Sequence, residues 1–245
     1  MLEIQDKNCF YLFNFDEPQA DQVRFFSPDF WQAQHRILGS AQGRGTTWFI
    51  QSQDLFGVNT ALRHYYRGGL YGKLNRDRYY FATLEQTRSF AEFRLLQRLH
   101  QAGLNVPKPI AAKVEKTGFC CYRADILTEK VENARDLTAL LQQQTLPKSS
   151  WQQIGKMIRK MHDLGICHTD LNAHNILVQQ TDNEQKVWLL DFDKCGEKSG
   201  NTWKQSNLER LKRSFLKEVE RMGIGFNDEN WGWLLVGYEL PLITE

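Results

Sequence analysis

The chain has 245 residues, enough for one large or two small domains, and its 31 Lys and Arg against 29 Asp and Glu leave a formal charge of +2. Hydrophobic residues at 41% and charged residues at 24% are ordinary for a globular protein and disfavour disorder or coiled coil. No apolar run reaches the roughly 20 residues that span a bilayer, and residues 1–6 are acidic and polar where an export signal would be basic and then apolar. The composition predicts a cytoplasmic globular protein without a membrane span, and it does not indicate a nucleic-acid partner.

The cysteines argue against both a disulfide framework and a structural zinc site. Their number is odd and none forms a C-x-x-C pair. We therefore expect five free thiols: Cys9, Cys120, Cys121, Cys167 and Cys195.

Turn and strand signals dominate the first third of the chain. Ser27 and Pro28 have the residue types of an N-cap and a first helical position, which predicts a short helix through His35. A glycine-rich segment, 39–47, is followed by a β-favouring run, and a second strand is predicted over 59–65. We interpret this region as a glycine loop within a β-hairpin.

Helical periodicity appears further along. Apolar residues recur near a 3.6-residue period in 87–101 and again in 149–164, and Gly103 and Gly165 follow these segments as stop signals. Between them, two strands are predicted at 119–123 and 125–128. The composition changes from strand to helix near Glu129, where we place the boundary between two lobes.

The segment after the second long helix has the spacing of a kinase catalytic loop. The run H-T-D-L-N-A-H-N matches the H-R-D-L-x-x-x-N signature at His168, Asp170, Leu171 and Asn175, with Thr169 in place of the usual arginine. Sixteen residues after Asn175, an apolar strand ends in D-F-D at Asp191, where protein kinases have D-F-G. The two motifs together, in this order and separated by strands, indicate phosphoryl transfer.

The residue types suit that chemistry. Phosphoryl transfer needs a carboxylate beside the attacking hydroxyl and oxygen ligands that hold Mg²⁺ against the nucleotide phosphates. We assign the first role to Asp170 as the catalytic residue and the second to Asn175 and Asp191 as metal ligands. His168 is expected to support the loop structurally.

The amino-terminal half supplies candidates for ATP binding. Gly39, Gly43 and Gly45 stand where a kinase covers the nucleotide phosphates, although their spacing is G-x-x-x-G-x-G. Arg63 occupies the place of the strand-three lysine, with Lys73 as an alternative cation, and Glu92 is the candidate partner of that cation. A further pair, Glu129 and Val131, is expected in the hinge whose backbone reads adenine.

These assignments predict an α+β, bilobal protein-kinase-like fold formed by one kinase-like domain, 1–245. Residues 1–129 would form a β-rich N-lobe and residues 130–245 a reduced, mainly helical C-lobe. Only 52 residues follow Asp193 and they contain no A-P-E motif, which disfavours a protein substrate and favours a small-molecule, sugar or lipid-linked acceptor. An aminoglycoside-type phosphotransferase and a nucleotide-binding pseudokinase remain alternatives.

Over most of its length the sequence resembles the Kdo kinases of bacterial lipopolysaccharide synthesis, in the lipopolysaccharide-core sugar kinase family. The resemblance rests on residues 43–48, 62–69, 87–93, 122–125, 170–175 and 191–193, and Arg63 and Asp193 are normal for that family. It implies transfer of the ATP γ-phosphate to the 4-hydroxyl of Kdo on a Kdo–lipid A precursor, with Kdo or heptose left open by the residues themselves. It also implies peripheral association with the cytoplasmic face of the inner membrane, with no obligate protein partner.

Two basic clusters bear on such a substrate. Between Arg63 and Tyr80 five cations, Lys73 among them, accompany a single acid, Asp77, and are interleaved with tyrosines. This basic-aromatic strip suits an anionic glycolipid surface, or equally a solvated loop. A second cluster, Lys204 to Arg221, is balanced by glutamates, and we interpret it as an ordinary helix face.

Overall fold

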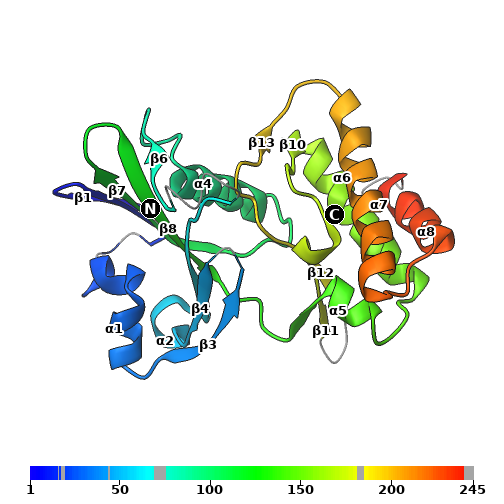
Figure 1. Cartoon of the computed structure of the whole chain (residues 1–245), viewed down its shortest axis with the longest axis horizontal. Coiled ribbons are helices and arrows are strands. Elements are labelled where there is room, and N and C mark those ends of the chain that lie inside the picture. Colours follow the sequence, from blue (N-terminus) through cyan, green and yellow to red (C-terminus); the bar gives the residue numbers. More distant parts are fainter. Residues whose placement is uncertain (16, 18–19, 44, 69–75, 181–184, 240–245) are drawn as a thin grey trace. The chain divides into compact units, whose positions relative to one another are not determined.

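The computed structural model describes residues 1–15, 17, 20–43, 45–68, 76–180 and 185–239. The chain divides into two compact units, 1–97 with 107–130 and 98–106 with 131–245 (Figure 1). The division after Lys130 lies next to the boundary expected at Glu129. Residues 98–106 group with the second unit, where the Leu189 N–H donates to Asn105 O at 3.0 Å. The sequence did not indicate this grouping.

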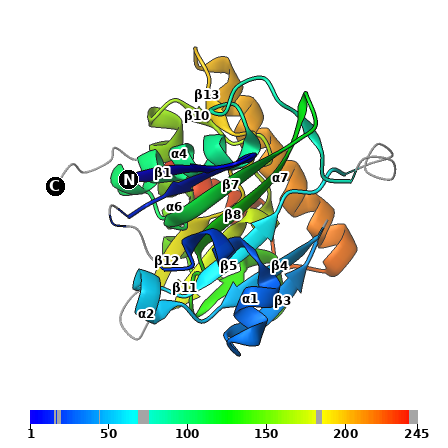
Figure 2. The ribbon, with the colours of Figure 1, turned by 90° about the vertical axis from the view of Figure 1, so that its left-hand side faces the viewer.

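An antiparallel sheet organises the first unit. Its strands run in the order β1-β2-β7-β8-β5-β4-β3, with β6 pairing on β8. Figure 2 labels β1, β7, β8, β5, β4 and β3 of this sheet. Their bounds are β1 Leu2–Asp6, β2 Cys9–Phe13, β3 Ile37–Gln42, β4 Thr46–Ile50, β5 Thr60–His64, β6 Tyr79–Tyr80, β7 Pro109–Thr117 and β8 Cys121–Glu129. The two strands predicted at 119–123 and 125–128 are thus one strand, because β7 pairs with β8 along its whole length.

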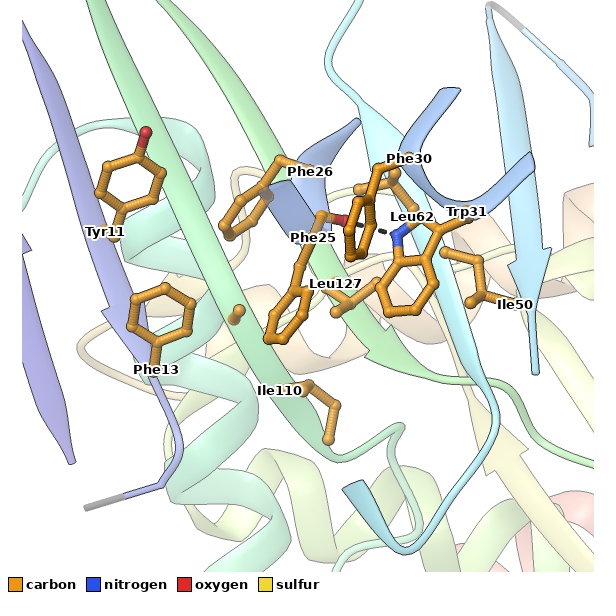
Figure 3. Close-up of a cluster of buried hydrophobic side chains, with 11 residues drawn as sticks. Tyr11, Phe13, Phe25, Phe26, Phe30, Trp31, Ile50, Leu62, Ile110 and Leu127 are labelled. Atoms are coloured by element: carbon orange, nitrogen blue, oxygen red, sulfur yellow. Dashed lines mark hydrogen bonds between the residues drawn. The ribbon is translucent and has the colours of Figure 1, made fainter. Parts of the chain in front are cut away.

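Aromatic side chains cover one face of this sheet. The short helices η1 (Gln22–Phe26) and α1 (Pro28–Ala33) place Phe25, Phe26, Phe30 and Trp31 against side chains from β2, β5, β7 and β8 (Figure 3). The buried Trp31 Nε1 donates to Phe25 O at 2.8 Å, which satisfies the only polar atom of the indole. A further short helix, α2 (Gln53–Phe56), follows β4.

The helix predicted at 87–101 is α4 (Arg88–Gln101). Strand alternation gives β5 two different faces: Leu62 joins the aromatic cluster, whereas Arg63 contacts Glu92 of α4. The Ser89 hydroxyl of α4 also donates to Lys113 O of β7 at 2.9 Å.

The second unit is mainly helical. The helix predicted at 149–164 is α6 (Lys148–Asp163), and Gly165 follows it with φ of 75°. A Cβ on Gly155 would lie 2.0 Å from Leu234 O, so glycine permits the close packing of α6 against α8. The other elements are β9 Ala134–Asp136, α5 Leu137–Leu141, β10 Ile166–Cys167, η2 Ala173–Asn175, β11 Ile176–Gln180, β12 Gln185–Leu189, β13 Gly196–Glu197, α7 Thr202–Met222 and α8 Asp228–Glu239.

Candidate active site

The β11–β12 hairpin brings the two predicted metal ligands to the same end of a small sheet. Ile176 pairs with Leu189, so Asn175, which precedes β11, lies opposite Leu190, which follows β12. The Leu190 N–H donates to Asn175 O at 2.8 Å, and Asp191 is the next residue. Antiparallel pairing therefore places Asn175 beside Leu190, the residue that precedes Asp191.

His168 connects the catalytic loop to the segment that carries Asp191. Its Nδ1 accepts from the Asp170 N–H at 3.3 Å, and its Nε2 donates to Leu190 O at 2.9 Å. The side chain is fully buried, with the Phe192 ring 4.9 Å away, and burial lowers the pKa of the imidazole. A neutral ring with one donor and one acceptor nitrogen matches these two bonds.

Asp170 combines a fixed backbone with an accessible carboxylate. Its carbonyl oxygen accepts from Asn172 Nδ2 at 3.1 Å and from Asn175 Nδ2 at 2.9 Å. The side chain is 42% exposed, and its Oδ1 accepts from Arg210 Nη2 at 2.5 Å. The loop thus presents the carboxylate outward. A group that receives a proton from an incoming hydroxyl must be accessible in this way.

Asn175 and Asp191 have the donor chemistry of a magnesium site. The Asn175 Nδ2 is bound to Asp170 O, which orients the side-chain oxygen as the available ligand. Asp191 has φ of 60°, an unusual backbone conformation for a residue with a side chain and one that clusters at functional sites. Within the described ranges no three His, Cys, Asp or Glu side chains converge as a metal site would require.

In the first unit, Arg63 is held by a buried carboxylate. Its Nη2 lies 2.7 Å and 2.6 Å from the two oxygens of Glu92, whose side chain is 4% exposed. The Tyr65 hydroxyl donates to Glu92 Oε2 at 2.6 Å, and burial, with the Glu92 charge, raises the pKa of that phenol well above its usual range. The arginine and its expected partner therefore meet, while Lys73, the alternative cation, lies outside the described residues.

The glycine hairpin is confirmed, but its loop is shorter than expected. β3 and β4 pair up to Gln42 and Thr46, and the Gly43 N–H donates to Gly45 O at 2.9 Å across the turn. Gly39 lies inside β3 beside a register shift, with φ of 156°. The prediction that it belongs to the loop is therefore wrong. A Cβ on Gly45 would lie 2.0 Å from the Tyr66 ring, so a larger residue there would force the ring to move.

The expected hinge residues occupy the end of the first unit and the start of the second. The Glu129 N–H donates to Lys108 O at 2.8 Å, and its carboxylate accepts from the Lys108 N–H at 3.0 Å. The Lys130 N–H likewise donates to Asn59 O at 2.8 Å. These two amides are therefore bonded within the first unit, and the contact of Glu129 and Val131 with adenine stays a prediction.

The described part of the basic-aromatic strip is ordered by its own contacts. Arg67 stacks over the Tyr79 ring at 4.7 Å and Arg76 over the Tyr66 ring at 5.1 Å. Asp77 pairs with Arg123 at 2.9 Å and with His64 at 3.4 Å. The single acid of the strip is therefore paired with His64 and with Arg123, which lies outside the strip.

Sequence reasoning missed the roles of two residues near the catalytic loop. Arg210 was expected on an ordinary helix face, but it bonds Asp170, so that interpretation is wrong for this residue. His174 links the loop to Asp136 at 3.1 Å and to Glu218 at 3.5 Å. Asp170 and Arg210 are forty positions apart in the sequence, so no local spacing could indicate their contact. His174, in contrast, lies inside the catalytic-loop motif.

Comparison with known proteins places the chain in a family. Residues 28–238 match the sequence profile of the Lipopolysaccharide kinase (Kdo/WaaP) family. The chain belongs to this family. The predicted resemblance to the lipopolysaccharide-core sugar kinases is thereby confirmed.

Curated members of the Kdo/WaaP family are similar over nearly the whole length. A 3-deoxy-D-manno-octulosonic acid kinase of Actinobacillus succinogenes is 72% identical, over 98% of this chain and 100% of its own. Proteins of the same name are 68% identical in Mannheimia succiniciproducens, over 98% and 100%, and 65% identical in Haemophilus influenzae, over 97% and 99%.

The structure of a family member, WaaP in complex with acyl carrier protein, confirms the fold class. It matches with a TM-score of 0.60 at 14% identity, over 93% of this chain and 88% of that one. The α+β, protein-kinase-like fold expected from the motifs is therefore correct.

Proposed function

We propose that the protein is a 3-deoxy-D-manno-octulosonic acid (Kdo) kinase, which transfers the γ-phosphoryl group of ATP to the 4-hydroxyl of Kdo on a Kdo–lipid A precursor. The names and nearly full-length coverage of the similar proteins support the acceptor. The observation that carries the reaction is the exposed Asp170 carboxylate on a loop fixed by His168 and Asn175. Membership in a kinase family supports ATP as the phosphoryl donor.

In this proposal Asp170 accepts the proton of the acceptor hydroxyl. The hydroxyl oxygen forms a bond to the γ-phosphorus, the bond from that phosphorus to the bridging oxygen breaks, and ADP leaves. Arg63, kept in place by Glu92, pairs with the nucleotide phosphates through its guanidinium charge. Bound Mg²⁺ supplies charge neutralisation of the phosphates, and Asn175 and Asp191 are the residues that would hold it.

The acceptor in this proposal is linked to lipid, so the reaction belongs at the cytoplasmic face of the bacterial inner membrane. None of the described helices is both long enough and apolar enough to cross a bilayer. Peripheral contact through the basic-aromatic strip is consistent with an anionic glycolipid surface.

The test of acceptor class offers several acceptors to the purified protein with γ-labelled ATP. A Kdo–lipid A precursor, a heptosylated core without a free Kdo 4-hydroxyl and a generic protein are incubated in parallel, with no other protein added. We expect label only in the first. Label in the heptosylated core alone would replace the proposal with a heptose kinase, and a requirement for an added carrier protein would overturn the absence of an obligate partner.

The role of Asp191 is tested by ligand-dependent stabilisation. Wild-type protein should show a rise in melting temperature with ATP and Mg²⁺ that exceeds the rise with ATP alone. Asp191→Ala should lose the additional rise that Mg²⁺ causes and keep the rise that ATP alone causes. An unchanged magnesium-dependent rise in the variant would remove Asp191 from the metal site.

A further inference from the structure

One edge of α7 runs along the catalytic loop. The Asn207 side chain donates to His168 O at 2.7 Å, and the Ser214 hydroxyl accepts from the Ala173 N–H at 3.1 Å. Glu218 contacts His174 at 3.5 Å. Positions 207, 210, 214 and 218 follow the helical repeat, so they form one stripe, and Arg210 is its member beside Asp170.

Arg210 differs from the rest of the stripe in exposure. Asn207 and Glu218 are buried, whereas the Arg210 side chain is 48% exposed. Among the described residues, Asp170 alone bonds its guanidinium, and the contact joins one nitrogen, Nη2, to one oxygen, Oδ1. A guanidinium carries five N–H donors in a planar fork, so most of its bonding capacity faces solvent.

The proposed reaction brings the acceptor sugar close to Arg210. An acceptor hydroxyl must lie within hydrogen-bond distance of the Asp170 carboxylate, so the sugar that carries it comes within a few ångströms of Arg210. An octulosonic acid carries a carboxylate on the same sugar. Arginine binds carboxylates through two parallel hydrogen bonds, which is a stronger arrangement than the single contact with Asp170.

We propose that Arg210 binds the carboxylate of the acceptor sugar and so selects an acidic sugar as the substrate. This inference rests on the proposed function and extends it to a specificity-determining residue. When the acceptor binds, the guanidinium exchanges the Asp170 carboxylate for that of the sugar. Asp170 then turns to the acceptor hydroxyl, and the exchange is inexpensive because both side chains are exposed.

The test compares steady-state kinetics of wild type, Arg210→Gln, Arg210→Lys and the control Arg213→Gln. Arg213 is an exposed arginine of the same helix, so its removal changes the net charge equally. Each protein is assayed with the Kdo–lipid A precursor and with the same acceptor carrying a methyl-esterified Kdo carboxylate. For Arg210→Gln we expect the KM for the acid acceptor to rise about 10- to 100-fold, the span expected for charge-assisted bonds. The KM for ATP and kcat should change less than about threefold.

The esterified acceptor separates carboxylate binding from other roles. Wild type should use it with the raised KM of Arg210→Gln, and Arg210→Gln should not distinguish ester from acid. Arg210→Lys should be intermediate because it keeps the charge and loses the planar fork. Arg213→Gln should behave as wild type, and all variants should unfold at the wild-type temperature.

Three outcomes would overturn the proposal. An unchanged acceptor KM in Arg210→Gln would remove Arg210 from acceptor binding. A fall in kcat with unchanged acceptor KM would assign the residue to the transferred phosphoryl group instead. If wild type phosphorylated neither acceptor and did not bind the Kdo–lipid A precursor in calorimetry, the proposed function would fail as well, and that result differs from a failure of Arg210 alone.

Discussion

Two arginines of this protein contact carboxylates, and the two contacts have different physical characters. In the first unit, Arg63 reaches both oxygens of Glu92, which is 4% exposed and receives a third bond from the Tyr65 hydroxyl. In the second unit, Arg210 reaches one oxygen of Asp170, and both side chains are more than 40% exposed. The first pair is enclosed and shared with a third group, whereas the second is open and isolated.

The difference shows which contact can change during a reaction. A buried carboxylate that loses its partner is left with an uncompensated charge, so the contact between Glu92 and Arg63 is costly to break. An exposed pair is worth about 0 to 1 kcal/mol and is replaced by water or by another carboxylate at little cost. We therefore expect the Arg63–Glu92 contact to persist during a reaction and the Arg210–Asp170 contact to be exchangeable.

The largest expected effect comes from breaking the enclosed pair. Glu92→Ala leaves the Arg63 guanidinium and the buried Tyr65 hydroxyl without their acceptor, and we expect a loss of about 3 kcal/mol in the free energy of unfolding. Urea unfolding measures it. The control is Glu85→Ala, whose exposed side chain pairs with Arg94 and should change stability by less than about 1 kcal/mol. Equal effects of the two substitutions would contradict the distinction between enclosed and open pairs.

Acid should destabilise the second unit through a buried neutral histidine. Burial lowers the pKa of His162 to about 4, and its Nε2 donates to Asn207, which in turn bonds His168 O. In the unfolded chain His162 takes up a proton near pH 6.5, whereas in the folded chain it stays neutral down to about pH 4. The stability that the neutral histidine contributes is therefore complete above pH 6.5 and is lost as the pH falls to about 4. The difference amounts to about 3 kcal/mol.

Urea unfolding between pH 7 and 4 checks this expectation. The slope of stability against pH should be smaller in His162→Gln than in wild type. His168, whose pKa burial also lowers, contributes to both proteins. Identical slopes would show that His162 takes up its proton in the folded protein.

A smaller effect is expected at the glycine hairpin. Gly45→Ala would place a Cβ 2.0 Å from the Tyr66 ring, and we expect a cost of about 1 to 3 kcal/mol as the ring moves. At Gly43 the nearest atom to an added Cβ is 3.8 Å away, so Gly43→Ala is the matched control and should be nearly neutral for stability. A large loss of ATP affinity in Gly43→Ala at unchanged stability would show that its backbone approaches the phosphates closely.

The smallest expected effect concerns the open pair. In a double-mutant cycle of Arg210→Gln and Asp170→Asn, the coupling energy for unfolding should be below about 1 kcal/mol and should fall further at high salt. Urea unfolding at two ionic strengths measures it. A coupling above about 2 kcal/mol would mean that the pair holds the fold together, which would make an exchange with substrate costly.

The sequence could predict that the two motifs lie close together because their spacing is local. Asp170, Asn175 and the D-F-D segment lie on one loop and one hairpin, and antiparallel pairing between β11 and β12 converts sequence order directly into proximity. Periodicity likewise predicted α4 and α6 to within one residue at either end. The Arg63–Glu92 pair was also predicted, because its two members occupy recognisable motif positions.

Contacts between distant elements could not be predicted from one sequence. Arg210 looked like its helical neighbours because only tertiary packing brings this position of α7 to Asp170. Gly39 was placed in the loop because glycine alone does not distinguish a turn from an irregular strand. The grouping of 98–106 with the second unit depends on a backbone bond to Leu189, which no local pattern indicates.

The most direct test of the account is the turnover of Asp170→Asn with the Kdo–lipid A precursor, measured beside its affinity for ATP. Asparagine keeps the size of the side chain and cannot accept the proton of the hydroxyl, so we expect kcat to fall by about 10²- to 10⁴-fold with ATP affinity unchanged. Asp228→Asn, at an exposed carboxylate of the same unit, should retain full activity. An Asp170→Asn variant with a kcat within a few fold of wild type would contradict the assignment of Asp170 as the catalytic carboxylate.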